Sequence, residues 1–458
     1  MLDRLIRLVA SAVMAAAGLV LAFSVDQVQA VPSLARQTGM DCSACHTVFP
    51  QLTPFGRKFK LTGYTISKNT DKKYEWPPPV SAMAQASFTH LSKDLPPSAV
   101  PAFSGANNNW DFQTASVFYA GRIYGSLGAF SQGTYNGVTK QFTIDNNDIR
   151  FAQTTKLFDK ELIYGITVNN NPTVQDVFNT VPAWEFPFAA SPVNLVPTAA
   201  TVIEGALAQK AAGGGIYAFW NDLLYLEGSA YVKANSGPMV WMGLGAQPFH
   251  AINVLNGVAP YWRAYLYHQW KKMNIMVGTF GLVANIFPNG QSQGPFNRFT
   301  DAGFDVQYQY LDDPHIVTLR STFIHEWQTL GAGSNIAIGT AQNLRNTLNS
   351  YKINGSYYYR TKNYGTIGGT IGYFYVGGTA DNILYAPASG TGSKNALPNS
   401  NGFIFELDYN PKAPFNRAQF SLQYTVFTQF NGGYGNYDGF GRNTSGNNTL
   451  YLLMWLAI

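Results

Sequence analysis

Two cysteines and a histidine form the stretch of this sequence with the clearest chemistry. Cys42 and Cys45 are separated by two residues, and His46 follows directly. Thiols at this spacing add to the two vinyl groups of one porphyrin, and a histidine directly behind them ligates the iron from one face. We therefore expect one covalently attached haem c, with thioethers at Cys42 and Cys45 and with His46 as an axial iron ligand.

Other uses of a Cys-x-x-Cys pair fit the sequence less well. Such a pair also occurs in redox dithiols and as one half of a zinc site. A zinc site needs a second pair of ligands, and the chain of 458 residues has no cysteine besides these two. The same count excludes a framework of disulfides, so haem attachment is the favoured interpretation.

The first thirty residues are typical of an export signal. Arg4 and Arg7 form a positive start, residues 8–23 are apolar, and Val28-Gln29-Ala30 resembles a cleavage site. The apolar run is short for a membrane anchor, so we expect a signal peptide over residues 1–30 that is removed. Bacteria attach haem c after export, which agrees with this prediction.

The composition indicates a membrane barrel. Charged residues make up 12% of the chain, against roughly 25% in ordinary soluble domains. Aromatic residues reach 15%, there are 44 glycines, and no later stretch approaches the ~20 apolar residues of a membrane helix. This combination predicts an all-β, transmembrane antiparallel β-barrel in the bacterial outer membrane. The net charge of +5 suggests no nucleic-acid partner.

The boundary between the head and the barrel is marked by a change in the period of the hydrophobic pattern. Apolar and polar residues alternate from Val80 to Thr89, and again in later segments such as residues 304–310 and 417–426. We predict about 16 strands over residues 80–458, a monohaem head or plug over residues 31–79, and external loops over residues 171–214, 233–258, 328–349 and 384–401. About fifty residues bury little apolar area alone, so the head needs the haem and a barrel wall.

Residues of the head and first strand are candidates for further haem contacts. Phe49, Leu52, Phe55 and Phe59 recur at helix-like spacing, which suits either a cover for the porphyrin or a small core.

The sixth iron ligand is left open by the sequence. Met83 shares the polar, inward parity of Ser81 and Gln85 and is the favoured candidate, with a five-coordinate or water-ligated iron as the alternative. Met40 lies awkwardly close to Cys42. The remaining candidates, His90, His268 and His325, fall on apolar, outward faces.

Charged residues give weaker indications. Arg57, Lys58 and Lys60 are candidate partners for the haem propionates, although a solvated basic face fits as well. Arg57 is favoured because a guanidinium matches a carboxylate. Asp305, Glu406 and Asp408 have inward parity and would suit a route for cations, although ordinary polar lining is the simpler explanation.

The segment from Ala35 to Tyr64, ARQTGMDCSACHTVFPQLTPFGRKFKLTGY, resembles the fused monohaem cytochrome–porins of the bacterial outer membrane, the cytochromes of iron-oxidising bacteria. The terminal stretch TLYLLMWLAI is similar to the closing strand of such barrels, with Ile458 where phenylalanine is usual. The resemblance implies a haem domain in or under the lumen and an oxidoreductase that takes electrons from extracellular Fe(II). It also implies a periplasmic cytochrome or copper protein as acceptor.

Three functions remain distinct at this point. The first is an outer-membrane conduit that oxidises Fe(II), or another donor. The second is a porin with a structural or sensory haem, and the third is a soluble periplasmic cytochrome with a large β domain.

Overall fold

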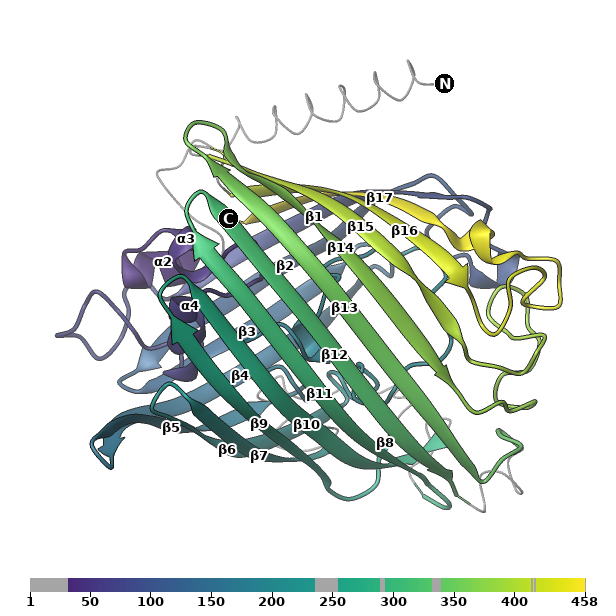
Figure 1. The fold of residues 1–458 in the computed structure, drawn as a ribbon, viewed down its shortest axis with the longest axis horizontal. Coiled ribbons are helices and arrows are strands. Elements are labelled where there is room, and N and C mark those ends of the chain that lie inside the picture. The colour runs from purple at the N-terminus through teal and green to yellow at the C-terminus, as the bar shows by residue number, and fades with distance from the viewer. Residues whose placement is uncertain are drawn as a thin grey trace.

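The computed structural model describes residues 32–234, 254–288, 293–331, 339–412, 415 and 417–457. The predicted signal peptide lies outside these residues. A small head (residues 32–79) carries three short helices, α2 (Pro32–Thr38), α3 (Cys42–Cys45) and α4 (Pro54–Leu61). The strand part begins with β1 at Val80, where the sequence predicted the barrel to start (Figure 1).

The strands form one closed antiparallel barrel. In chain order they are β1 (Val80–Leu91), β2 (Asn109–Tyr124), β3 (Leu127–Asn136), β4 (Gln141–Leu157), β5 (Lys160–Asn169), β6 (Ala211–Trp220), β7 (Leu224–Lys233), β8 (Val254–Leu255), β9 (Ala259–Trp270), β10 (Met273–Phe287), β11 (Asn297–Asp312), β12 (His315–Leu330), β13 (Arg345–Thr361), β14 (Gly365–Gly378), β15 (Ser400–Pro411), β16 (Ala418–Gln429) and β17 (Thr449–Ala457). β1 pairs with both β2 and β17, which closes the barrel.

The seventeen named strands make a barrel of sixteen. The two-residue β8 and the longer β9 both pair with β10, at Ile286↔Leu255 and Leu282↔Tyr261. They are therefore one strand interrupted at residues 256–258, and 17 − 1 gives 16. The expected strand number is confirmed.

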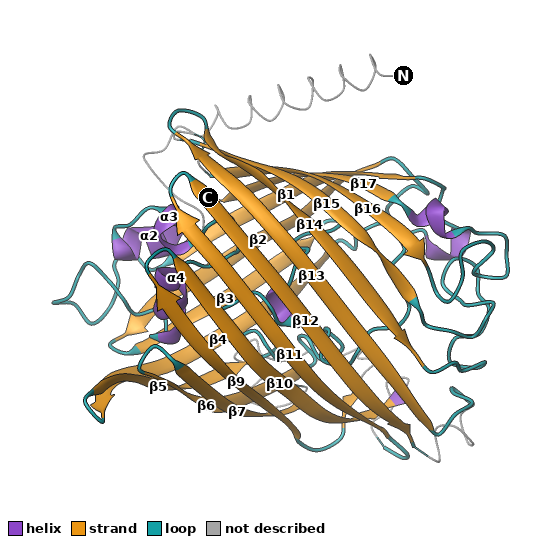
Figure 2. Ribbon diagram, viewed as in Figure 1, coloured by secondary structure: helices purple, strands orange, loops and turns teal. Residues whose placement is uncertain are grey.

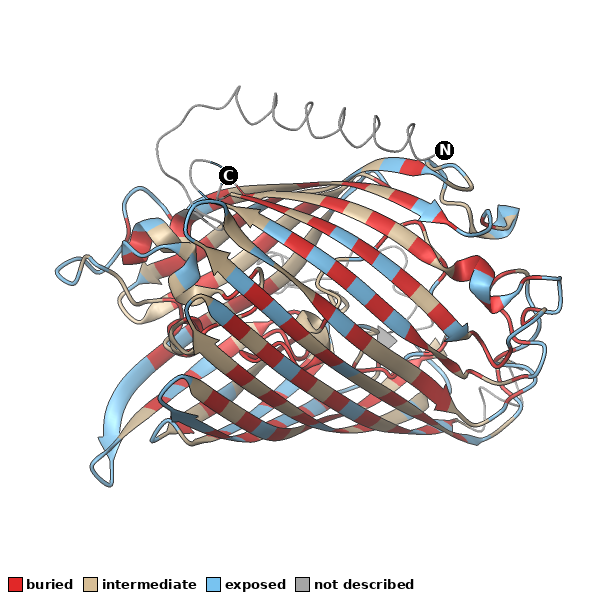
Figure 3. Ribbon diagram, turned by 45° about the horizontal axis from the view of Figure 1, so that its top comes forward, coloured by how far each residue is buried: buried red, intermediate tan, exposed pale blue. Residues whose placement is uncertain are grey.

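Side chains alternate between the two faces of the wall as the sequence predicted. On β11, Phe304 is 64% exposed whereas its neighbour Asp305 is 4% exposed. Buried and exposed residues alternate in the same way along the other strands (Figure 3). Outward residues are largely apolar or aromatic and inward residues largely polar, which is the pattern of a barrel with lipid outside.

The two ends of the barrel differ. At one end the strands are joined by short turns, such as residues 125–126, 158–159 and 271–272, and the helices of the head gather there (Figure 2). At the other end the connections are longer. Short turns face the periplasm in outer-membrane barrels, so the head lies at the periplasmic end.

One of the longer connections between strands folds back into the lumen of the barrel. Residues 170–210, between β5 and β6, form an inserted loop that lies in the lumen and bonds to inward residues of many strands. Thr322 Oγ1 on β12 donates to the carbonyl oxygen of Thr180, and Gln423 Nε2 on β16 donates to that of Ala189, the latter at 3.1 Å. The predicted external loop over residues 171–214 is therefore wrong: most of its valines, together with Phe178 and Phe186, are buried inside the barrel.

No helix among the described residues is long and apolar enough to cross a bilayer. The closed antiparallel wall satisfies its own backbone hydrogen bonds, carries an apolar outer surface and has short turns at one end. These are the features by which outer-membrane proteins cross the bilayer. The chain is a β-barrel of the bacterial outer membrane.

Candidate functional site

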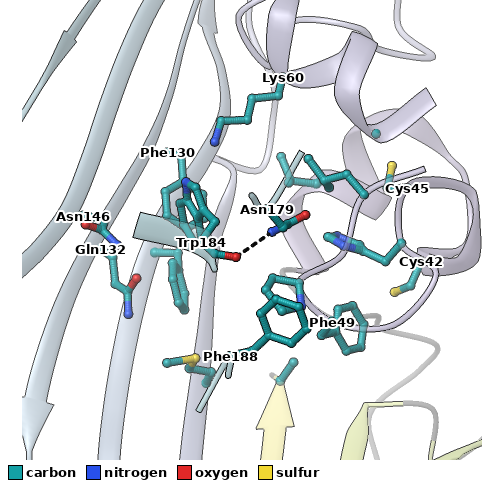
Figure 4. A pocket seen from close by; sticks show the side chains of 18 of the residues that line it. Cys42, Cys45, Phe49, Lys60, Phe130, Gln132, Asn146, Asn179, Trp184 and Phe188 are labelled. Carbon is teal, nitrogen blue, oxygen red and sulfur yellow. Dashed lines mark hydrogen bonds between the residues drawn. The ribbon is translucent and has the colours of Figure 1, made fainter. Parts of the chain in front are cut away.

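A cavity of about 450 Å³ lies between the head and the lumen of the barrel. The residues of the Cys-x-x-Cys-His motif line one side of it, and the inserted loop lines another (Figure 4). The strands that complete its wall are β1, β2, β3, β4 and β17. Three segments that are far apart in the sequence therefore meet at one site.

The motif is presented by the packing of α3 against α4. Thr53 caps α4, accepting from the backbone N–H of Gly56 at 3.2 Å and donating to the carbonyl oxygen of Ala44 at 2.5 Å. Gly56 lies against the backbone of Cys45, and a Cβ at this glycine would overlap the Cys45 carbonyl oxygen. The glycine is needed because α4 crosses directly behind the motif.

His46 is half-buried in the head. Burial lowers its pKa to about 4, an effect that the backbone of Pro50 and Gln51 opposes. Nδ1 has no partner that meets hydrogen-bond geometry in the described part of the chain. The ring lies 5.0 Å from that of Phe49. A neutral imidazole with an unsatisfied nitrogen is the form in which histidine binds a metal.

The two cysteines are half-buried and line the cavity. Burial raises the pKa of the Cys45 thiol to about 11. The side chains around them are mainly apolar and aromatic, and a volume of 450 Å³ lies in the range of cofactor sites, about 300–1,000 Å³. The donor set, the orphaned imidazole nitrogen and the size of the cavity all fit a covalently held haem.

Three of the four residues that recur at helix-like spacing line the cavity. Phe49, Leu52 and Phe59 line the cavity. Phe55 instead faces a second cavity on the other side of α4. Phe55 and Phe59 are four residues apart within α4, yet only Phe59 lines the first cavity, so the common face predicted from the spacing is not shared by all four residues.

Met83 lines the cavity from β1, together with Gln85, as its strand parity predicted. Met40 lines it as well and is 42% exposed. His90 and His268 are exposed, and His325 packs against Trp327 at 4.3 Å on the outer face of β12. Of the ligands considered from the sequence for the second side of the iron, the structure brings only the two methionines to the cavity.

Arg57 does not take the position expected of a propionate partner. Its side chain is 3% exposed and points from α4 to the barrel wall, where it donates to Gln309 at 2.8 Å and to Asn274 at 3.0 Å. It also lies 4.8 Å from the centre of the Phe178 ring. The propionate expectation is corrected because these partners already occupy the guanidinium, and Lys60 and Arg417 are the basic residues that line the cavity.

The three carboxylates that the sequence placed in the lumen point inward, and each accepts a hydrogen bond from another side chain. Asp305 accepts from Arg263 at 2.8 Å, Asp408 from Tyr358 at 2.7 Å, and Glu406 from Gln423 at 2.7 Å. Within the described residues no cluster of three or more His, Cys, Asp or Glu side chains forms a metal site. These acids line the lumen, as expected, without building an ion site.

The inserted loop contributes the residues that the sequence did not predict. Asp176, Asn179, Trp184 and Phe188 line the cavity from this loop, and Phe130 lines it from β3. Trp184 packs against Phe130 at 5.9 Å and donates from Nε1 to the Val174 carbonyl at 2.7 Å. The one available signal was the density of proline and aromatic residues between Pro182 and Phe188, which is unusual for a solvated loop.

No family model and no curated protein matches the chain. Among solved structures it is similar to the trimer form of OmpT, an outer membrane protein of Vibrio cholerae, with 11% identity and a TM-score of 0.43 over 83% of this chain and 98% of that one. It is similar to the outer membrane channel DcaP of Acinetobacter baumannii, with 8% identity and a TM-score of 0.43 over 83% and 96%. An anion-selective porin from Comamonas acidovorans gives 9% identity and a TM-score of 0.43 over 83% and 98%. At these TM-scores the likeness supports no assignment, and the barrel is defined by its own strand pairing.

Proposed function

We propose that this protein is an outer-membrane c-type cytochrome that takes electrons from extracellular Fe(II) and passes them to a periplasmic electron carrier. The observation that carries the proposal is the position of the Cys-x-x-Cys-His motif, which lines a cofactor-sized cavity between the head and the barrel lumen. An open diffusion pore has no need of such a cavity.

The residues of the cavity define what the protein does for the cofactor. Haem c, when bound, supplies a one-electron couple. Cys42 and Cys45 hold it by thioethers, and His46 offers a neutral ring nitrogen to the iron. Apolar and aromatic side chains make up much of the wall, and the polarity of the surroundings is one of the means by which a protein sets a haem potential.

The cavity reaches the surface at the periplasmic end of the protein, where an electron acceptor can approach it. Met40 is partly exposed at the periplasmic end and also lines the cavity, so the site reaches the surface where a cytochrome or copper protein docks. Inside the lumen, Asp305 pairs with Arg263 and Glu406 accepts from Gln423, so these carboxylates belong to the polar wall. Fe(II) as the donor rests on the resemblance of residues 35–64.

The alternative of a solute porin with a structural haem is disfavoured by the loops. The inserted loop lies across the lumen, and loops at the extracellular end interlock: Tyr437 donates to the carbonyl oxygen of Gly390 at 2.8 Å, and Arg442 to that of Asp94 at 2.6 Å. An electron needs no open channel, whereas a solute does.

The test uses the full-length mature protein, purified from outer membranes and stained for covalent haem. Oxidised protein is mixed anaerobically with Fe(II), and the visible spectrum follows reduction. We expect rapid reduction in the wild type, and no haem stain but an intact barrel in the Cys42→Ala, Cys45→Ala double variant. Absence of covalent haem in the wild type would overturn the proposal. Reduction by dithionite but not by Fe(II) would overturn iron as the donor.

A further inference from the structure

The inserted loop forms the side of the cavity that faces the haem motif. In Figure 4, Asn179 lies between Trp184 on one side and Cys42 and Cys45 on the other. The loop is fixed in this place from several directions. Lys60 donates to the carbonyl of Asp176 at 2.7 Å, and Arg150 donates to that of Gln175 at 2.7 Å. The residues that follow are therefore held at a defined distance from the motif.

Asn179 is placed by a tight turn. Its φ of 59° lies in the left-handed region, which asparagine tolerates better than most residues. One carboxylate oxygen of Asp176 accepts from the backbone N–H groups of Phe178 at 2.9 Å and of Asn179 at 3.0 Å. This turn directs the Asn179 side chain into the cavity that it lines.

The amide of Asn179 is oriented but only half satisfied. Nδ2 donates to the carbonyl oxygen of Trp184 at 3.3 Å. This hydrogen bond distinguishes the nitrogen of the amide from its oxygen. Oδ1 has no hydrogen-bond partner within the described part of the chain, and the residue is 4% exposed. A buried acceptor without a partner is energetically unfavourable, so an oxygen in this state marks a place where a ligand supplies the donor.

We propose that Asn179 is the polar positioning residue on the side of the cavity opposite the haem motif. Its Oδ1 accepts a hydrogen bond from water or another protic molecule in the cavity, and its dipole favours the ferric over the ferrous haem. This inference rests on the proposed function, because it needs the haem. It adds a residue from the middle of the chain, more than 130 positions after His46, to the control of the redox potential.

Two substitutions of Asn179 distinguish the effect of an added charge from the effect of losing the amide dipole. Asn179→Asp has the same shape and adds a negative charge next to the cavity, which stabilises the ferric state. We expect about a tenfold rise in the ferric-to-ferrous ratio at fixed solution potential, equal to about 59 mV for one electron. Asn179→Gly keeps the left-handed backbone and removes the amide, so the ratio should change in the opposite direction.

The measurements are the midpoint potential and the visible spectrum of the haem-loaded, full-length protein. Asn221→Gly is the matched control, because Asn221 has a φ of 56° in the exposed turn between β6 and β7. It should leave both measurements unchanged.

Opposite shifts in the two Asn179 variants support the inference. Wild-type potential and spectrum in Asn179→Asp, with haem attached, overturn it while leaving the proposed function intact. A wild type without covalent haem overturns both. If Asn179→Gly does not assemble, the isosteric Asn179→Asp alone decides the question, by the sign of its shift.

Discussion

The ammonium nitrogen of Lys60 lies 4.8 Å from the centre of the Trp184 ring. The same nitrogen donates to the backbone carbonyls of Val174 and Asp176, each at 2.7 Å. One side chain of α4 thus ties the head to the inserted loop and closes the cavity between them.

Replacement of Lys60 by Met should loosen this contact. The Asp176 carbonyl loses the Lys60 donor and the Val174 carbonyl keeps only that of Trp184, so we expect a loss of about 1–3 kcal/mol in the free energy of unfolding. Denaturant titration in detergent, followed by tryptophan fluorescence, measures it. Lys58→Met is the control, because Lys58 pairs with Glu161 where both side chains are about two-fifths exposed, and such pairs contribute about 0–1 kcal/mol. Equal losses in the two variants would contradict the prediction.

The stability of the protein should depend on pH through Lys60. Burial, followed by the positive charge of Arg150, lowers the pKa of Lys60 from 10.5 to about 7. Between these values the folded protein binds fewer protons than the unfolded chain, so this group makes stability rise as pH rises from 7 to 10.5. The free energy of wild type minus that of Lys60→Met should therefore increase across this window. A flat or falling difference would refute the assignment.

A methyl group at Gly56 should disturb the haem motif. In Gly56→Ala the new Cβ overlaps the Cys45 carbonyl oxygen, so α4 must move away from α3. We expect a loss of about 1–3 kcal/mol from overpacking, together with a lower yield of covalent haem per barrel. Gly228→Ala on β7 is the comparison, because a Cβ there meets nothing within 4 Å. The ratio of haem absorbance to protein should fall only in the first variant.

Met83→Ala tests the second iron ligand. A methionine ligand raises the potential of a haem relative to histidine. If Met83 ligates the iron, the variant should change its visible spectrum and shift the ferric-to-ferrous ratio about tenfold, or about 59 mV. Met454→Ala on the adjacent β17 provides the control, because Met454 has outward parity, opposite to that of Trp455, which lines the cavity. An unchanged spectrum and potential in Met83→Ala would remove it as a ligand.

The filled lumen predicts a low ionic conductance. Barrels of sixteen strands leave an aqueous channel when their lumen is free. Here the inserted loop is held in part by Lys352, which pairs with Glu185 at 2.6 Å and with Glu204 at 2.7 Å. In planar bilayers we expect the wild type to conduct roughly tenfold less than an open barrel of this size. Lys352→Met should increase the conductance, whereas a large, steady wild-type conductance would favour a porin.

The sequence predicted the barrel well because its signal is repeated. Alternation such as Phe304 against Asp305 recurs on strand after strand, and each inward or outward assignment depends only on parity. The same reasoning placed Met83 in the lumen and His90 and His268 outside. It also brought Cys42, Cys45 and His46 to one site, because they are neighbours in the chain.

The other half of the cavity was not predictable in this way. Asn179 and Trp184 lie in a segment without periodicity, and nothing local distinguishes a loop that folds inward from one that faces solvent. Their positions depend on partners that are far away in the sequence, such as Lys60, Arg150 and Arg263. Arg57 was misassigned for the same reason, since Gln309 and Asn274 approach it from distant strands.

The first and last strands of the barrel meet beside the cavity. Met83 and Gln85 on β1 lie opposite Ala457 and Trp455 on β17, and all four line the site. The seam between the first and last strands is therefore also a wall of the cavity. A barrel that has not joined its first and last strands has no complete cavity, so closure of the barrel also completes the cavity.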